Sequence, residues 1–490
     1  MNSVGSLIGF SEAKEVTTTF NTFNPKKNTQ NKNSYAVASK NDINNALKLA
    51  DEAFSEQYKF SDKDRSIFLE LIIEFLIQDE KTLENTYCIE SGLSKNRFKT
   101  EFSRTINTIR LFSELIKKES WKKISTSISN NITASIEKKR FPIGPVLVFG
   151  ASNFPLAYST AGGDSIAAFA VGCPVIVKAH PFHAGTSHLV AKAIIKANKK
   201  SNLPEGFFSH IQDNTFEAAN MLIKDNRIKA IGFTGSINGG NAIYDIAAKR
   251  NSPIPVFCEM GSSNPIIIFE NQINNPKNLW ANKIAEAICN DAGQFCTKPG
   301  LIFIPKSSNG NKFKTRLIHE IINTQACYML HPSIKSNYEK LIKERIKTSK
   351  GDFFQSNEKT AILKAKPSLL CVDINKFMQE KSLQEEVFGP FCVLITYTNK
   401  TELKKAIKKL HGQLTYTFIG KKDDFKNDII NIGVNRSGRI IFNDVPTGVQ
   451  TCSSMHHGGP YPASSDSRFS AVGTDSIHRF TRPVAFQNIK

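Results

Sequence analysis

Short apolar runs alternate with helical patterns between residues 146 and 233, and this alternation constrains the fold more than any other feature of the sequence. The runs predicted to be strands are 146–149, 174–178, 207–211 and 230–233. The segments predicted to be helices between them are 157–171, 184–198 and 215–224. Strands that alternate with helices at this spacing form a parallel, doubly wound sheet.

The same alternation resumes after Pro255. Its predicted strands are 264–269, 301–304, 368–373, 391–396 and 439–442. Its predicted helices are 278–288, 311–323, 335–348 and 401–409. Helical periodicity also covers 42–57, 62–90 and 95–119, where no chemistry is evident. A chain of 490 residues is too long for one ordinary core, so we expect two α/β domains.

Residues 123–141 differ from both runs. Ile124, Thr126 and Ile128 alternate with serine, which predicts an extended arm or hairpin. The final segment, 475–488, is mixed and polar, as is typical of an edge strand. An arm of this kind can leave its own domain and pair with a second copy of the chain.

Charge and cysteine usage exclude several classes of protein. The net charge of +20 is spread over scattered lysines, without a basic stripe or interleaved aromatic residues, so we expect no nucleic-acid partner. No apolar run has transmembrane length, and residues 1–6 do not resemble a secretory signal, so we expect no membrane association. Nine cysteines at irregular spacings form neither a CxxC pair nor a zinc pattern, which indicates free thiols in a reducing cytoplasm.

One of the cysteines, Cys296, lies among small, polar and turn-forming residues in the stretch 290–300. An apolar run, 301–304, follows, so the thiol is predicted to lie near the end of a loop that enters a buried strand. A thiol in that position is well placed for nucleophilic chemistry. The alternative is an inert buried cysteine, which is the commoner role, and the partners of the thiol decide between the two.

Three polar features follow predicted strands of the first run. Asn153 could donate its amide to a developing oxyanion, or could merely suit a turn. Lys178 ends a strand and could reach ribose hydroxyls or a phosphate, unless it is a solvated side chain. Gly235 and Ser236 precede a helix whose N-terminus favours a phosphate, although the segment lacks GxGxxG spacing and could be a tight turn.

Three further loops carry acids or histidines. Glu259 lies between two predicted strands beside apolar residues, and partial loss of water would suit it to general-base work; the alternative is a surface acid. Glu386 and Phe388 precede a Gly-Pro turn. His456 and His457 have no CxxC motif or acid neighbour in the sequence, so we expect no metal site.

Together these segments resemble the aldehyde dehydrogenase superfamily over nearly the whole chain. In chain order, the matching motifs are the Asn153-Phe154-Pro155 turn, Val177-Lys178, Phe233-Thr234-Gly235-Ser236, Glu259-Met260-Gly261, Gly293-Gln294-Phe295-Cys296 and Glu386-Val387-Phe388-Gly389-Pro390. Segments 154–164, 178–180 and 457–469 further resemble the branch that contains α-ketoglutaric semialdehyde (2,5-dioxovalerate) dehydrogenases and NADP-dependent fatty aldehyde dehydrogenases.

The resemblance implies an α/β, aldehyde dehydrogenase-like fold with two doubly wound parallel-sheet domains and a β-arm. It places a cofactor-binding domain in 1–122 and 142–257 and a catalytic domain in 258–470. It places an oligomerisation arm in 123–141 and 471–490, which implies a homodimer or homotetramer.

The resemblance also implies how the aldehyde reacts. Cys296 would attack the aldehyde as a thiolate, while Asn153 and the Cys296 backbone N–H would hold the oxyanion. Hydride would leave for a nicotinamide, and Glu259 would activate the water that releases the acid. His457 would tune the thiol or the cofactor end.

Five further residues would hold the cofactor. Lys178 and Glu386 would bind its riboses, Phe388 would lie on the nicotinamide side, and Gly235 and Ser236 would meet the pyrophosphate.

The choice between NADP and NAD rests on two departures from the relatives. Pro181 stands where many NAD-preferring relatives carry a glutamate, and residues 212–217 lack the arginine that the NADP-using branch carries for the 2′-phosphate. The branch resemblance favours NADP.

The predicted function is NAD(P)-dependent oxidation of an aldehyde to a carboxylic acid, with α-ketoglutaric semialdehyde as substrate and 2-oxoglutarate as product. The alternatives are a medium- or long-chain fatty aldehyde dehydrogenase, an acylating dehydrogenase that passes the thioester to coenzyme A, and a catalytically silent binding protein on the same fold. Glu259 argues against the second alternative, and Cys296 with Glu259 against the third. The sequence does not identify a cation for the substrate carboxylate.

Overall fold

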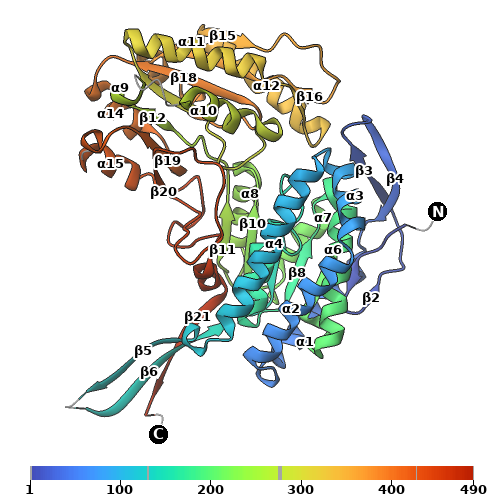
Figure 1. Ribbon diagram of the computed structural model, residues 1–490. Coiled ribbons are helices and arrows are strands. Elements are labelled where there is room, and N and C mark those ends of the chain that lie inside the picture. The colour runs from blue at the N-terminus through green and yellow to red at the C-terminus, as the bar shows by residue number, and fades with distance from the viewer. Residues whose placement is uncertain (1–2, 130–131, 274–278, 426, 489–490) are drawn as a thin grey trace.

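The computed structural model describes residues 3–129, 132–273, 279–425 and 427–488, and it contains two large sheets and a projecting three-stranded arm (Figure 1). Residues 1–2, 130–131, 274–278, 426 and 489–490, which fall within the predicted domains, the arm and the helix 278–288, lie outside the described residues. No helix in the described part combines the length and apolar content needed to cross a bilayer.

The first sheet contains the four strands predicted between residues 146 and 233. They are β7 (Val146–Phe149), β8 (Val175–Lys178), β9 (Phe208–Ile211) and β10 (Ala230–Thr234). They pair in parallel in the order β10-β7-β8-β9, which confirms the doubly wound prediction. A further strand, β11 (Val256–Glu259), pairs in parallel with β10. At the other edge, β1 (Leu7–Ile8) pairs antiparallel with β9, and β2 (Ser11–Glu12) pairs antiparallel with β1.

The helices on this sheet differ from prediction in two places. They are α1 (Lys40–Ser55), α2 (Asp62–Gln78), α3 (Glu80–Ser91), α4 (Lys95–Ile116), α5 (Gly163–Val171), α6 (Ala184–Ser201), α7 (Glu217–Lys224) and α8 (Ile237–Ala248). The single helix predicted over 62–90 is wrong, because Asp79 (φ −97°, ψ 8°) leaves helical geometry and separates α2 from α3. The helix predicted from 157 begins at Gly163, because the buried Glu101 carboxylate accepts the Leu156 and Ala157 N–H groups (2.8 and 3.0 Å) and holds that segment as a turn.

The second sheet is also parallel, apart from one edge strand. Its order is β15 (Asp352–Gln355), β17 (Ser368–Asp373), β18 (Phe391–Tyr397), β13 (Leu301–Pro305), β12 (Ile266–Ile268), β19 (Gln413–Ile419) and β20 (Ser437–Phe442). Only β15 runs antiparallel, against β17. β19 was not predicted because Gln413 and Thr415 interrupt its apolar pattern. Both residues are buried, and each forms a hydrogen bond: Gln413 Oε1 accepts the Ser263 N–H, and the Thr415 hydroxyl donates to Asn264 Oδ1.

The helices of this second unit are α9 (Glu270–Ile273), α10 (Trp280–Cys289), α11 (Ser308–Asn323), α12 (Pro332–Ser349), α13 (Ile374–Gln379), α14 (Lys400–Lys409) and α15 (Asn427–Val434). The domain boundary expected after residue 257 falls inside β11, which belongs to the first sheet. The chain therefore passes from the first sheet to the second only after Glu259, before β12.

The arm combines segments from distant parts of the chain. β6 (Ile132–Pro142) pairs antiparallel with β5 (Lys123–Ser129) on one side and with β21 (Thr481–Gln487) on the other. In Figure 1 this ribbon projects away from both sheets. The arm was expected to include all of residues 471–490. The first part of this segment instead packs against α5 of the first sheet, where Arg479 forms an ion pair with Asp164 at 2.7 Å.

Candidate active site

Cys296 lies near the end of the loop between α10 and β13, as the sequence predicts. Asp291, Ala292 and Gly293 adopt three successive left-handed conformations, with φ of 46°, 57° and 61°. This region costs a non-glycine residue about 1–2 kcal/mol, so tertiary contacts must hold the loop. At Gly293 an added Cβ would lie 2.5 Å from the Gly389 carbonyl oxygen, which excludes a side chain.

Two side-chain amides fix the loop on either side of the thiol. Asn264 Nδ2 donates to the carbonyl oxygen of Cys296 at 2.8 Å. Asn153 Nδ2, in the turn after β7, donates to the carbonyl oxygen of Gln294 at 3.0 Å. Asn153 therefore lies beside the cysteine loop, as predicted from its place after the strand, and its second amide hydrogen could reach an oxyanion.

The Cys296 thiol contacts a buried ion pair. His457 Nε2 lies 3.5 Å from Cys296 Sγ and 2.8 Å from Glu259 Oε1. Burial opposes a charge on His457, but the negative charges of Glu259 and Cys296 outweigh it and raise the pKa of His457 to about 9. His457 is therefore a cation at neutral pH, and a cation beside a thiol favours the thiolate.

Glu259 is the last residue of β11. The expectation that it lies in a loop between two strands is therefore wrong. Glu259 also forms an antiparallel bridge with Ser464, which brings the loop of His457 alongside. His457 thus has an acid neighbour in space that its sequence neighbours do not supply. Donor atoms of Glu259, Cys296 and His457 all lie within 4.8 Å of one another, a grouping that could also hold a metal ion.

Other cysteines have different surroundings. Burial raises the pKa of Cys173 to about 11 and the pKa values of Cys258, Cys289 and Cys371 to about 12. Thiols of this kind stay protonated and inert at neutral pH. Cys296 differs from these four because it is only half-buried and because its sulfur lies 3.5 Å from the His457 cation.

Lys178 marks the carboxyl edge of the first sheet. It is 8% exposed, so it is a buried lysine and not a solvated one. Its Nζ donates to the carbonyl oxygen of Asp213 at 2.6 Å, and burial lowers its pKa against the opposing charge of Asp213. The Asp213 carboxylate accepts the Thr215 N–H and hydroxyl through Oδ1, each at 2.8 Å. Its Oδ2 is buried and has no hydrogen-bond partner in the described part of the chain.

The N-terminus of α8 is open to solvent. Ser236 caps the helix by accepting the Gly239 N–H at 3.1 Å, and both Gly235 and Ser236 are exposed. A Cβ on Gly235 would lie 2.5 Å from Phe233 Cζ, so any larger residue would have to displace the Phe233 ring. An exposed helix N-terminus with such an approach fits the pyrophosphate of a dinucleotide.

A loop of the second unit reaches the same region. A Cβ on Gly261 would lie 2.2 Å from Glu386 Oε2 and 3.8 Å from Ile237 Cγ1, which places Glu386 near the first residue of α8. Burial raises the pKa of Glu386 to about 7. Phe388 is half-buried, next to Gly389, whose carbonyl group packs on the cysteine loop. The structure thus brings this loop between the α8 N-terminus and the cysteine loop.

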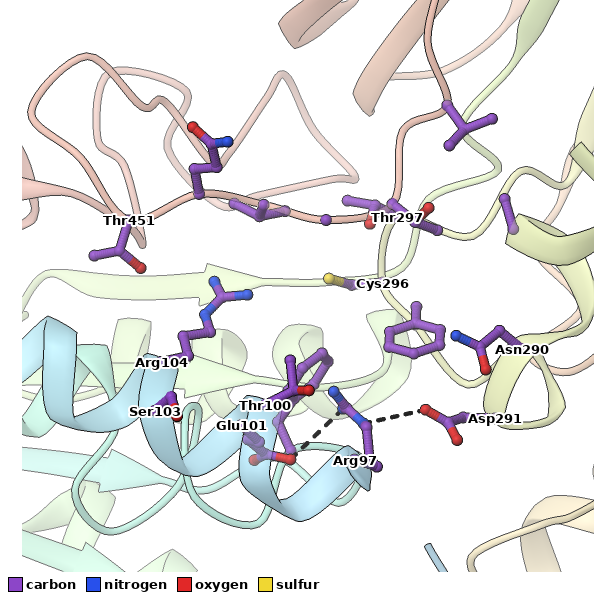
Figure 2. A pocket seen from close by; sticks show the side chains of 18 of the residues that line it. Arg97, Thr100, Glu101, Ser103, Arg104, Asn290, Asp291, Cys296, Thr297 and Thr451 are labelled. Atoms are coloured by element: carbon purple, nitrogen blue, oxygen red, sulfur yellow. Dashed lines mark ion pairs between the residues drawn. The ribbon is translucent and has the colours of Figure 1, made fainter. Parts of the chain in front are cut away.

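A cavity of about 1200 Å³ opens at Cys296. Its walls come from α4, the cysteine loop and residues 444–452 (Figure 2). No chemistry was predicted for α4, yet Arg97 and Arg104 of this helix line the cavity together with Tyr158 and Thr451. The only available signal was a pair of arginines seven residues apart on the polar face of an amphipathic helix.

Comparisons with known proteins agree with this architecture. The aldehyde dehydrogenase family model matches residues 10–483. The chain is 36% identical over 466 residues to an alpha-ketoglutaric semialdehyde dehydrogenase of Acinetobacter baylyi, covering 93% of this chain and 88% of the relative. It is 33% identical over 470 residues to alpha-ketoglutaric semialdehyde dehydrogenase 2 of Azospirillum brasilense, with the same coverage of 93% and 88%.

Solved structures share the fold at lower identity. A betaine aldehyde dehydrogenase variant of Staphylococcus aureus superposes with a TM-score of 0.86 at 18% identity, covering 100% of this chain and 99% of the other. A Thermus 1-pyrroline-5-carboxylate dehydrogenase with bound NAD gives 0.85 at 18% identity, covering 99% and 93%. The chain therefore belongs to the aldehyde dehydrogenase family, whose members are oxidoreductases that act on aldehydes with NAD or NADP.

Proposed function

We propose that this aldehyde dehydrogenase oxidises α-ketoglutaric semialdehyde to 2-oxoglutarate through a thioester on Cys296. The observation that carries the proposal is the contact of the thiol with His457 and Glu259, at a cavity whose wall holds Arg104. Such a cavity suits a substrate with an aldehyde at one end and a carboxylate at the other. The relatives from Acinetobacter baylyi and Azospirillum brasilense, at 36% and 33% identity, are named for this substrate.

The first step uses the cysteine and its two neighbouring loops. The Cys296 thiolate, beside the His457 cation, forms a bond to the aldehyde carbon, and the carbonyl oxygen becomes an oxyanion. The Cys296 backbone N–H and the second amide hydrogen of Asn153 are the proposed donors to that oxyanion. Because its first amide hydrogen is held by Gln294 at 3.0 Å, the Asn153 donor is oriented before the substrate arrives.

A nicotinamide cofactor, when bound, accepts the hydride that leaves the substrate carbon. The residues proposed to hold that cofactor are those at the edge of the first sheet and the loop facing it. Lys178 and Glu386 bind its riboses, and Gly235 and Ser236 bind its pyrophosphate. Phe388 orients the nicotinamide side.

Glu259 is proposed to act on the thioester. Its carboxylate takes a proton from a water molecule, which attacks the thioester carbon, and the C–S bond breaks to return the thiolate. A retained base favours hydrolysis over transfer to coenzyme A. Product analysis with and without coenzyme A checks this, and formation of an acyl-coenzyme A would contradict the assigned role of Glu259.

The proposed cofactor preference is NAD. The branch resemblance favours NADP, but the structure adds a buried carboxylate, Asp213, at the strand end beside Lys178. A 2′-phosphate would bring nearly two negative charges close to that carboxylate, whereas a ribose hydroxyl would bring none. This repulsion is the ground on which NAD is proposed here, although the branch resemblance favours NADP.

Assembly and compartment complete the proposal. The β5 edge of the arm offers unpaired backbone groups to a second copy, which supports a homodimer or homotetramer. All nine cysteines are free, which supports a reducing compartment such as the cytoplasm. The cofactor-binding and catalytic domains are assigned to the first and second sheets.

An initial-rate matrix tests the proposed substrate and cofactor. It measures kcat/KM for α-ketoglutaric semialdehyde, succinic semialdehyde and fatty aldehydes, each with NAD and NADP. The proposal predicts the highest value for α-ketoglutaric semialdehyde with NAD. A preference for fatty aldehydes would overturn the substrate, and the absence of reduced cofactor in every combination would indicate a catalytically silent protein.

A further inference from the structure

We propose that Arg104 and Thr451 form a carboxylate-binding subsite that recognises the end of the substrate remote from its aldehyde. The inference rests on the proposed function, because it supplies the group that would select an aldehyde carrying a carboxylate. It concerns the wall of the cavity and not the reacting atoms.

Two arginines on α4, Arg97 and Arg104, lie two turns apart and have different surroundings. Arg97 is neutralised: its Nε lies 3.3 Å from Asp291 Oδ2 and its Nη2 lies 3.6 Å from Glu101 Oε2. The Arg97 guanidinium also stacks 4.3 Å from the centre of the Phe154 ring. Arg97 therefore connects α4 to the loops on either side and has little charge left for a ligand.

Arg104 has no acidic partner. Among the described residues it forms no ion pair; its Nη2 donates to Tyr158 Oη at 2.7 Å, and its guanidinium carbon lies 5.1 Å from the centre of the Tyr158 ring. A guanidinium has five N–H donors, so most of them remain available. Figure 2 shows this guanidinium extending from α4 into the cavity that also exposes Cys296, whereas Arg97 is tied to Glu101 and Asp291. A half-buried cation without an acid favours an anionic ligand.

Thr451 supplies the second donor. It lines the same cavity, and its Oγ1 lies 3.4 Å from the Oγ1 of Thr108, whose own hydroxyl donates to the Arg104 carbonyl oxygen at 2.9 Å. The Thr451 hydroxyl can rotate, so its hydrogen is available to an acceptor in the cavity. One carboxylate oxygen can thus accept from Thr451 while both oxygens face the fork of Arg104.

The charge around the subsite points the same way. Arg439 of β20 is within electrostatic reach of Arg104 and Cys296, and its Nη2 donates to the Pro446 carbonyl oxygen. Arg439 also forms no ion pair with any residue the structure describes. Of the acids that line the cavity, Glu286 and Asp444 are exposed, so water screens them, and Glu101 and Asp291 are paired with Arg97. The Arg104 guanidinium itself is therefore left without an acid beside it.

The same charge disfavours the rival substrates. An alkyl chain placed against Arg104 would remove water from a guanidinium without replacing its hydrogen bonds, which is unfavourable. The subsite therefore selects for a carboxylate and against a long apolar tail.

The experiment compares two five-carbon aldehydes, α-ketoglutaric semialdehyde and pentanal, in wild type, Arg104→Gln and Arg104→Lys. The readout is the ratio of kcat/KM for the two aldehydes, because the ratio cancels effects on the chemistry they share. We expect the ratio to fall about 10- to 100-fold in Arg104→Gln, since hydrogen bonds to charged groups are of that strength. Arg104→Lys, which retains charge without the fork, should give an intermediate ratio.

Arg110→Gln is the matched control, because Arg110 is an exposed arginine of the same helix. Its ratio should equal that of wild type. An unchanged ratio in Arg104→Gln would overturn the subsite while leaving the proposed substrate intact. A wild-type preference for pentanal would instead overturn the proposed substrate.

A binding measurement covers the case in which Arg104→Gln does not fold. In wild type, 2-oxoglutarate should protect Cys296 from alkylation by iodoacetamide at concentrations where pentanoate does not. Arg104→Lys should need several-fold more 2-oxoglutarate for the same protection. Equal protection by the two acids in wild type would contradict a second carboxylate contact.

Discussion

The thiol of Cys296 lies between two sides of the molecule that are built in different ways. The proposed nucleotide side, comprising Lys178, Gly235, Ser236 and Glu386, uses strand ends, a helix N-terminus and a closely approached glycine. The aldehyde side uses side chains from α4, the cysteine loop and residues 444–452. Backbone groups offer little freedom to vary, whereas side chains can be exchanged singly. We infer that the family's common cofactor is met by the first kind of construction and its individual aldehydes by the second.

The substitution with the largest expected effect removes the nucleophile and leaves the proposed nucleotide side unchanged. Cys296→Ala should lose at least about 10⁴-fold in kcat, because no other group can form the thioester. Binding of NAD, measured by calorimetry, should be retained. Cys88→Ala, which changes another half-buried thiol, should behave as wild type. Normal turnover in Cys296→Ala would remove the basis of the comparison.

Glu259→Gln should separate the two halves of the reaction on the aldehyde side. We expect a burst of reduced cofactor followed by turnover slowed about 100-fold, because general-base contributions are of this size. Rapid-quench or stopped-flow absorbance would measure the burst. A steady-state rate equal to wild type would exclude Glu259 as the base.

The His457 cation should control the thiol through its charge. At pH 7, alkylation of Cys296 by iodoacetamide should be about 5- to 10-fold slower in His457→Gln than in wild type. Because the pKa of His457 is raised to about 9, wild type keeps this advantage at neutral pH and loses it as pH rises through about 9.

His456 is the matched control for that measurement. Burial lowers the pKa of His456, so it is neutral at pH 7 and carries no charge to remove. His456→Gln should alkylate at the wild-type rate. Equal rates in wild type and His457→Gln across this pH range would show that the contact does not influence the thiol.

The smallest expected effect lies on the nucleotide side. Asp213→Asn removes a buried negative charge without changing side-chain size, and should raise the ratio of NADP to NAD activity about 5-fold. Initial rates with both cofactors measure it. A wild-type preference for NADP would contradict the assigned role of Asp213 and restore the preference that the branch resemblance favours.

The positions of residues at strand ends could be predicted from the sequence, whereas the contacts around the thiol could not, for a physical reason. Lys178 and Gly235 follow local strand patterns, and a strand end fixes where the next residues lie. The pairing of His457 with Glu259 depends on the bridge between Glu259 and Ser464, which no local pattern reveals. Arg104 resembles any exposed arginine on an amphipathic helix until the fold places it in the cavity.

Contacts between residues remote in sequence also account for the wrong predictions of secondary structure. The helix predicted from residue 157 fails because the Glu101 carboxylate, supplied by a distant helix, holds that backbone as a turn. β19 escaped prediction because its buried polar residues are satisfied by partners remote in sequence. Continuous apolar runs such as those of β7 and β13 were predictable because their burial needs no partner-specific contact.

The composition of the arm sets an order of events during synthesis. β6 can pair with β5 as soon as residue 142 has emerged, but its other edge stays open until β21, residues 481–487, has been made. Both large sheets are complete in sequence before that point. Isolated two-stranded hairpins are marginal in water, so the arm gains its third strand only after both cores can have folded. Contacts between copies through this arm would then be restricted to chains whose translation has passed the last core strand.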